Sequence, residues 1–204
     1  MKSLLLIGGG GHCNSCIDVI ETTKTFKIKG VIDSKASLRH VLGYPVIGSN
    51  EDLPQLLKVS ELALVTVGQI KNPKIRIKLF EHSKQLGAKL AIVVSPKAHF
   101  SKHSIIGEGS IIMHGAIVNA GAQIGNNCIV NSQALLEHGV EVHDHCHIST
   151  GALINGDVSI GKGSFIGSGA TIKESVRVGN NVGVGAGQVV LRDVPDGAVV
   201  KHES

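Results

Sequence analysis

Residues 106–141 read IGEGSI IMHGAI VNAGAQ IGNNCI VNSQAL LEHGVE, and the same six-residue pattern continues to Val190. Every sixth residue from Ile106 to Val190 is Ile, Leu or Val, fifteen times in succession. A period of six does not fit the 3.6 residues of a helical turn, but it suits short strands joined by Gly and Asn corners. If three hexads close one triangular coil, residues eighteen apart stack and the aliphatic side chains fill the interior. The stretch therefore predicts a parallel β-helix of about five coils.

A second repeated position, four residues after each aliphatic one, is mostly small, as at Ala116 and Ala134. Cys128 and Cys146 occupy this position eighteen residues apart, and we expect them to stack as reduced interior thiols. So narrow an interior has no room for aromatic rings, in agreement with an aromatic content of 2%. Because no insertion interrupts the hexads, catalytic groups are not expected to come from a long protruding loop.

The composition changes near residue 95, and we divide the chain of 204 residues into two domains, 1–95 and 96–204. An apolar strand over 3–7 runs into four glycines at 8–11, and a helical pattern follows, as in a phosphate-binding turn between a strand and a helix. The pattern predicts a small parallel sheet with helices. Its further expected elements are strands over 28–33, 61–68 and 88–94, and a helix over 74–85.

Composition and charge exclude several classes of function. The formal net charge of +4 is mild, the basic residues are scattered and aromatic stacking platforms are missing, which argues against a nucleic-acid partner. No apolar run reaches the length of a membrane span and no signal-peptide pattern precedes Gly8, so a soluble cytoplasmic protein is expected.

The glycine turn and the cysteines beside it carry little cofactor signal. Cys13 stands where the last Gly of a G-x-G-x-x-G motif belongs, which disfavours a dinucleotide cofactor, whereas the helix N-terminus can still bind a phosphate. Cys13 and Cys16 form a single C-x-x-C pattern without a second pair, which disfavours a metal or redox role.

The densest polar stretch, EHGVEVHDHCH at 137–147, has three interpretations. In the first, its histidines are polar residues on a solvent-exposed strand face and have no further role. In the second, His143, His145 and His147 alternate along a strand, project to one side and bind Zn²⁺ together with ligands from an adjoining coil or subunit. In the third, a neutral histidine, with an unperturbed pKa of about 6.5, takes a proton from an amine or hydroxyl that attacks a thioester.

The sequence resembles the NeuD/PglD-type sugar acetyltransferases. The resemblance implies a small Rossmann-like α/β domain followed by a left-handed parallel β-helix, and a homotrimer without a metal. It implies that acetyl-CoA is the co-substrate and that its acetyl group passes directly to the amino group of a nucleotide-activated sugar. The matching segments are LLLIGGGGH at 4–12, VID at 31–33, TVG at 66–68, SPKA at 95–98 and NSQALLEH at 131–138, followed nine residues on by His147.

The resemblance also implies roles for individual residues. His138 matches the general base, and His147, Asn131 and Glu137 match positions near the acetyl group or the sugar. The acetyl-CoA arm is expected to lie in the cleft between two protomers, near Gly156 and Ala186. The region that holds the sugar or its nucleotide corresponds to Gly11, His12, Asp33, Ser34, Lys35 and Gly68.

The six-residue register adds two expectations about the base. His138 comes two positions after interior Leu136, so its side chain is expected to project from the coil. Gly156, eighteen residues on, is expected to leave open space beside His138 where a thioester can lie.

Two departures from the family pattern leave questions open. Relatives place Asp or Glu directly after the catalytic histidine to fix its tautomer, whereas this chain has Gly139, and the orienting group is then Glu141, Asp144, a neighbouring subunit or water. The family's Gly-x-Pro-Ala does not follow residues 193–197, which puts the contacts with the CoA adenine in doubt.

Other activities stay open at this stage. Within the same fold, the alternative is O-acetylation of sialic acid or a related nonulosonate, because the sequence does not separate an amine from a hydroxyl acceptor. From another class, the alternatives are a metal-dependent hydratase and a binding module without catalysis, the latter because of Gly139.

Overall fold

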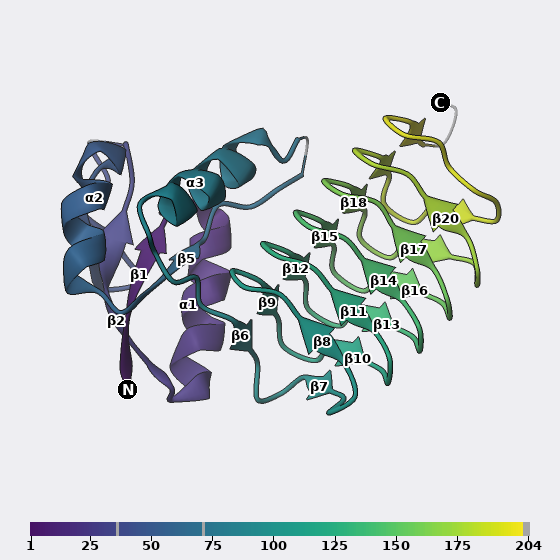
Figure 1. Ribbon diagram of the computed structural model, residues 1–204, viewed down its shortest axis with the longest axis horizontal. Helices are drawn as coiled ribbons and strands as arrows, with labels where there is room; N and C mark the ends of the chain where they lie inside the picture. Colours follow the sequence, from purple (N-terminus) through teal and green to yellow (C-terminus); the bar gives the residue numbers. More distant parts are fainter. Residues whose placement is uncertain (36, 71, 202–204) are drawn as a thin grey trace.

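A five-stranded sheet with helices on both faces forms the amino-terminal unit of the computed structural model, which describes residues 1–35, 37–70 and 72–201 (Figure 1). The strand order is β3-β4-β2-β1-β5, and the pairs are parallel except for the β3–β4 hairpin. The strands are β1 Lys2–Ile7, β2 Phe26–Ile32, β3 His40–Val41, β4 Tyr44–Gly48 and β5 Leu62–Val65. The helices are α1 Gly11–Thr23, α2 Leu53–Leu56 and α3 Lys74–Gln85, with 3-10 turns at Asn50–Asp52 and Leu57–Val59.

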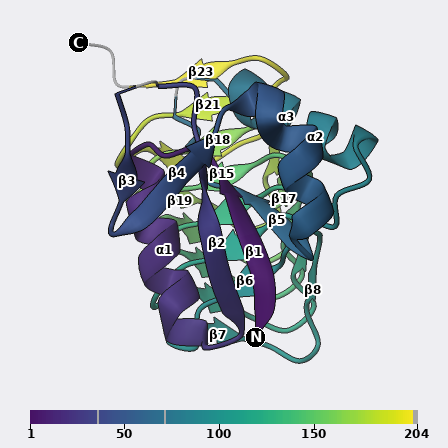
Figure 2. The same ribbon diagram turned by 90° about the vertical axis from the view of Figure 1, so that its left-hand side faces the viewer.

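Alternating side chains along β1 divide the core of this unit in two. Leu4 and Leu6 pack on the face that α1 covers. Leu5 packs on the opposite face with Leu53 of α2 and Phe80 of α3. Figure 2 shows α1 on one side of β1 and β2, with α2 and α3 on the other.

The hexads form the predicted parallel β-helix, whose two-residue strands line three sides of a coil (Figure 1). Nearly every strand pairs in parallel with the strands eighteen residues before and after it, as Ile117–Val118 does with Leu135–Leu136. The interior aliphatic positions, such as Val118 and Leu136, are fully buried.

Sheets 1, 2 and 3 denote the three sides of the β-helix, in the order in which the chain crosses them after β6 Val93–Val94, which itself belongs to sheet 3. Sheet 1 contains β7 His99–Phe100, β10 Ile117–Val118, β13 Leu135–Leu136, β16 Leu153–Ile154, β19 Thr171–Ile172 and β22 Val189–Val190. Sheet 2 contains β8 Ile105–Ile106, β11 Gln123–Ile124, β14 Glu141–Val142, β17 Ser159–Ile160 and β20 Arg177–Val178. Sheet 3 contains β6 Val93–Val94, β9 Ile111–Ile112, β12 Ile129–Val130, β15 His147–Ile148, β18 Phe165–Ile166, β21 Gly183–Val184 and β23 Val199–Val200.

The strand predicted over 88–94 is wrong in its extent and in its partners. Leu90 makes only an isolated bridge to Ala63 of β5, and Val93–Val94 forms β6, which pairs with β9 of the β-helix. This short segment therefore leaves one sheet and enters another, although its continuous apolar run is typical of a single strand. The predicted domain boundary at 95 and 96 follows directly after β6.

Helix α1 packs between the amino-terminal sheet and sheet 3 (Figure 1). Cys16 and Ile17 share one buried apolar cluster with Ile111 and Ile129 of sheet 3. Burial raises the pKa of Cys13 to about 11 and that of Cys16 to about 12, so both thiols are protonated near neutral pH. The C-x-x-C pair belongs to the core that joins the two units.

Arg76 of α3 holds the two units together from a position that is 1% exposed. Its Nη1 donates to the carbonyls of Val65 and Val67 at 2.6 and 2.9 Å, at the end of β5. Its Nε donates to the carbonyl of Asn127 at 3.3 Å and its Nη2 to that of Gly109 at 3.4 Å, on corners of the β-helix. Burial lowers the pKa of Arg76 to about 10, so the guanidinium stays charged and keeps these donors at neutral pH.

We expect Arg76→Met to lower the free energy of unfolding by about 2–4 kcal/mol, because it leaves buried carbonyls without a donor. The matched control is Arg177→Met at an exposed position of sheet 2, for which a change within about 0.5 kcal/mol is expected. Urea denaturation followed by circular dichroism measures both values. Equal midpoints for the two variants would contradict the assigned role of Arg76.

Candidate active site

His138 lies on the corner between sheets 1 and 2, two residues after the end of β13. Its side chain is 68% exposed, in agreement with the register. Its Nδ1 lies 4.0 Å from Oδ1 of Asp157, which is on the next coil of the same corner. Glu137 is occupied elsewhere, because its Oε2 accepts from the Asn119 amide at 2.9 Å and from the His138 N–H at 3.3 Å.

The imidazole of His138 lies against Gly156. A Cβ at Gly156 would be 2.6 Å from Cε1 and 2.9 Å from Nε2 of the ring. The expectation of open space at this position is therefore wrong, because the imidazole itself occupies it. The missing side chain lets the ring of His138 approach the backbone of the next coil.

His147 and Asn131 belong to another part of the β-helix. His147 is on β15 of sheet 3 and is 5% exposed, and its Nδ1 donates to the carbonyl of Gln69. Its Nε2 is consequently the acceptor for the Asn131 amide at 3.3 Å. The ring of Phe165 lies edge-on at 5.3 Å, and burial lowers the pKa of His147 to about 4. His147 is thus a neutral imidazole in one tautomer near neutral pH.

His12 faces this pair from the first turn of α1. Its ring centroid is 6.4 Å from that of His147, and a Cβ at Gly68 would be 3.2 Å from the Cβ of His12. Burial, and then the charge of Arg76, lower the pKa of His12 to about 3. Within the described residues, the buried His12 Nε2 and Gln69 Oε1 have no hydrogen-bond partner. Unpaired polar atoms therefore collect where the two units meet.

Asp33 holds the glycine turn. Its Oδ2 accepts from the Gly9 N–H and its Oδ1 from the Lys35 N–H, both at 2.7 Å. Gly10 caps α1 without a side-chain hydrogen bond, and a Cβ at Gly10 or Gly11 would meet no atom within 4 Å. The amides at the start of α1 therefore border open space, an arrangement that favours an anion.

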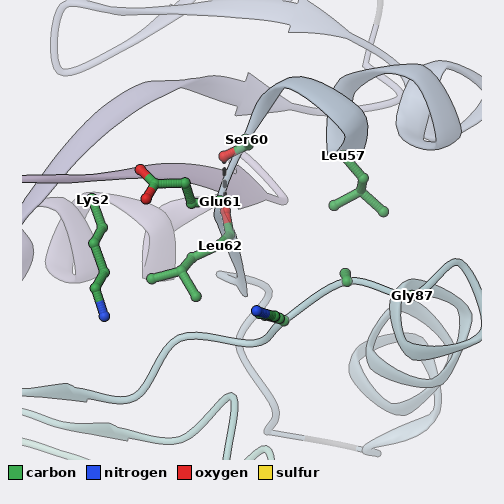
Figure 3. Close-up of a pocket in the computed structure, with 8 residues that line it drawn as sticks. Lys2, Leu57, Ser60, Glu61, Leu62 and Gly87 are labelled. Carbon is green, nitrogen blue, oxygen red and sulfur yellow. Dashed lines mark hydrogen bonds between the residues drawn. The ribbon is translucent and has the colours of Figure 1, made fainter.

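A cavity of about 330 Å³ opens at the carboxyl ends of β1 and β2, where open α/β sheets bind their ligands. Asp33, Ser34 and Lys78 line it, and Ser34 Oγ accepts from the Asn50 amide at 3.1 Å. A second cavity of about 380 Å³, which Lys2 borders, lies at the opposite, amino ends of β1 and β5 (Figure 3). None of the predicted site residues lines it, so we assign the site to the carboxyl ends.

The three alternating histidines do not project to one side, and that prediction is wrong. Only His147 lies in a strand, because the coil turns a corner between His143 and His145. His143 is exposed, whereas His145 is buried, with Nε2 3.4 Å from Oε1 of Glu81 on α3. In the ranges 1–35, 37–70 and 72–201, no three His, Cys, Asp or Glu side chains gather closely enough to hold a metal ion.

The predicted residues thus form separate groups. Six residues and one side of the coil, at most about 20 Å long, separate Asn131 from His138. Ala186 follows β21 on the corner between sheets 3 and 1, as Asn131 follows β12, whereas Gly156 shares the corner of His138. The groups are His138, Glu137 and Gly156; Asn131, His147, His12 and Gly68; and Gly11, Asp33, Ser34 and Lys35 around the glycine turn.

Sequence reasoning missed two contacts of this site. Asp157 stands eighteen residues after Gly139, so the register alone contained the signal for its place beside His138. Gln69 had no such signal, because its contact with His147 depends on how the amino-terminal unit docks on sheet 3.

No helix in the described ranges combines the length and the apolar character needed to cross a membrane.

Comparison with known proteins gives matches along most of the chain. Residues 3–83 match the family model of the PglD N-terminal domain. Residues 103–138 and 121–156 match that of the bacterial transferase hexapeptide (six repeats), and residues 157–192 match that of the hexapeptide repeat of succinyl-transferase. No curated protein matches the chain.

Solved structures match over nearly the whole length. The acetyltransferase domain of PglB from Neisseria gonorrhoeae FA1090 is 34% identical, with a TM-score of 0.91 over 98% of this chain and 96% of that chain. The same domain in complex with acetyl coenzyme A is 35% identical, with a TM-score of 0.91 over 97% and 95%. PerB from Caulobacter crescentus in complex with CoA and GDP-perosamine is 30% identical, with a TM-score of 0.90 over 98% and 93%.

The lowered pKa of His147 predicts a pH dependence of stability. Below pH 6.5 the unfolded chain binds a proton at this histidine, whereas the folded chain does not until about pH 4. The free energy of unfolding therefore decreases as the pH falls through this window. The expected contribution is about 1 kcal/mol per pH unit between pH 6 and 4.5. Urea midpoints of the native chain and of His147→Gln measure it: the slope of stability against pH is expected to be smaller in the variant, and equal slopes would contradict a neutral buried His147.

Proposed function

This chain belongs to the family of sugar acetyltransferases that join a PglD N-terminal domain to hexapeptide repeats, and on that premise we propose that it acetylates the amino group of a nucleotide-activated amino sugar. It is an acyltransferase with a left-handed β-helix, and acetyl-CoA is its co-substrate. The observation that carries the proposal is the exposed imidazole of His138, seated on Gly156 with a carboxylate near its Nδ1.

His138 is the general base in this proposal. With Nδ1 directed toward Asp157, Nε2 is free to accept a proton. The sugar amine attacks the thioester carbonyl, a C–N bond forms, and the amine proton passes to Nε2. The C–S bond then breaks, and the imidazolium returns the proton to the CoA sulfur. No residue of the protein is acylated on this route.

The acceptor nucleotide is assigned to the amino-terminal unit. The open amides of Gly10 and Gly11 at the start of α1 suit a phosphate, and the cavity beside Ser34 has room for neighbouring groups. The bound GDP-perosamine of PerB supports a nucleotide-linked acceptor.

We further infer that the acceptor and acetyl-CoA meet between protomers of a homotrimer. Sheet 1 carries a stripe of outward apolar residues on adjacent coils, Ile117, Leu135 and Leu153, and Val189 continues it beyond Thr171. Leu153 is 40% and Val189 63% exposed, whereas α1 covers the outward residues of the first strands of sheet 3, Ile111 and Ile129 among them. The outward residues of sheet 2 are mostly polar. A second copy packed on sheet 1 would bury this stripe and bring its own residues to the His138 corner.

The base is tested by His138→Ala in a thiol-release assay with acetyl-CoA and a panel of UDP- and GDP-linked amino sugars and free sialic acid. Turnover with a nucleotide-linked amino sugar is expected to fall by about two to four orders of magnitude. Melting temperature and oligomeric state are expected to stay unchanged because the side chain is exposed. His143→Ala, at another exposed histidine, is the control and should keep full turnover. Unchanged turnover in His138→Ala would exclude it as the base, and activity with free sialic acid alone would exclude the amino acceptor.

The trimer is tested by Leu153→Lys. Placing a charge in the apolar stripe is expected to shift the mass in sedimentation velocity from trimer toward monomer and to lower activity with it. Val59→Lys, at an apolar residue of the amino-terminal unit that is 74% exposed, should leave the trimer intact. A monomeric native chain, or a Leu153→Lys variant that remains a trimer, would contradict the assigned interface.

A further inference from the structure

The chain has no carboxylate directly after its proposed base, because Gly139 follows His138. We infer that Asp157, one coil further along the β-helix, is the positioning residue that orients His138. This inference rests on the acetyl transfer proposed above and concerns how the imidazole is held during it.

Gly139 and Asp157 are stacked at equivalent positions of adjacent coils. Both have left-handed φ angles, of 67° and 58°. The Asp157 N–H donates to the carbonyl of His138 at 3.0 Å, which ties the two corners together. A Cβ at Gly139 would lie 2.1 Å from Oδ1 of Asp157. The Asp157 carboxylate therefore occupies the space that a side chain at Gly139 would need, and Gly139 makes room for it.

The distance and chemistry suit an orienting contact. Nδ1 of His138 and Oδ1 of Asp157 are 4.0 Å apart, and both side chains are about two-thirds exposed, so a small rotation of either forms a hydrogen bond. Such contacts are often long in free enzymes and shorten when the substrate binds. A carboxylate at Nδ1 holds the proton there, leaves Nε2 as the base, and stabilises the imidazolium that forms.

The other carboxylates near this corner have other partners or lie elsewhere. Glu137 accepts from Asn119, and Asp144 accepts from the Asn126 N–H at 2.7 Å on a different corner. Across residues 1–35, 37–70 and 72–201, Asp157 supplies the only carboxylate oxygen within 4.0 Å of a ring nitrogen of His138.

The first test is Asp157→Asn, because Asn tolerates the left-handed backbone and removes only the charge. We expect kcat to fall roughly 10–100-fold, with the KM for acetyl-CoA changed less than about twofold and with the melting temperature and trimer unchanged. Glu174→Gln is the matched control, at an exposed carboxylate on the same corner one coil beyond Asp157, and should keep full turnover. An Asp157→Asn enzyme with native kcat, or one changed only in KM, overturns the inference.

The second test moves the carboxylate back beside the base. Asp157→Gly is expected to lower kcat as Asp157→Asn does, and the double variant Gly139→Asp/Asp157→Gly is expected to recover roughly tenfold of the loss, because both positions accept Gly or Asp at a left-handed φ. A folded double variant that stays as slow as Asp157→Gly overturns the inference.

The two levels of proposal fail differently. If His138→Ala is inactive while Asp157→Asn is fully active, the base stands and the positioning role falls. If His138→Ala keeps native turnover, both fall. A larger loss in Glu141→Gln than in Asp157→Asn also overturns the inference, in favour of that carboxylate.

Discussion

Parallel hydrogen bonding between residues eighteen apart is the constraint on which the rest of the structure depends. Each two-residue strand exchanges backbone hydrogen bonds with the strands above and below it, as Ile117–Val118 does with Leu135–Leu136. The pairing stacks like positions on like positions, so the columns of Ile, Leu and Val fill the interior along its whole length. The small position also admits buried serines, because Ser110 and Ser164 each donate to a backbone carbonyl and accept from a backbone N–H.

The same constraint makes each corner residue the neighbour of the residue eighteen positions away. Gly156 leaves the place where the His138 ring lies, and Gly139 leaves the place that the Asp157 carboxylate fills. The environment of a corner side chain thus depends on residues that are about eighteen positions away in the sequence and one coil away in space. The surroundings of His138 are therefore set by residues on the adjacent coil, Gly156 and Asp157.

The three sides of the β-helix have different neighbours. The first strands of sheet 3 are covered by α1, and Arg76 fixes the amino-terminal unit against the β-helix, which brings His12 against His147. Sheet 1 presents its apolar stripe to solvent in the single chain, directly beside the His138 corner. His138 consequently lies on the side of the coil that is turned away from the amino-terminal unit, as the proposed active site between protomers requires.

The amino-acid sequence by itself determined the β-helix, its register, the exposure of His138 and the helix over 74–85. These features follow from the period of the pattern and the size of the side chains, which can be read from neighbouring residues and fixed spacings. Predictions from such patterns failed where the path of the chain changes within a few residues, at 88–94 and at His143 to His147, since apolar runs and alternation do not reveal a corner. Only the tertiary structure decided that His147 is a buried neutral imidazole and that the ring of His138 fills the space over Gly156. The reason is that protonation and contact distance depend on which distant groups share a site, and docking and packing of distant segments decide that.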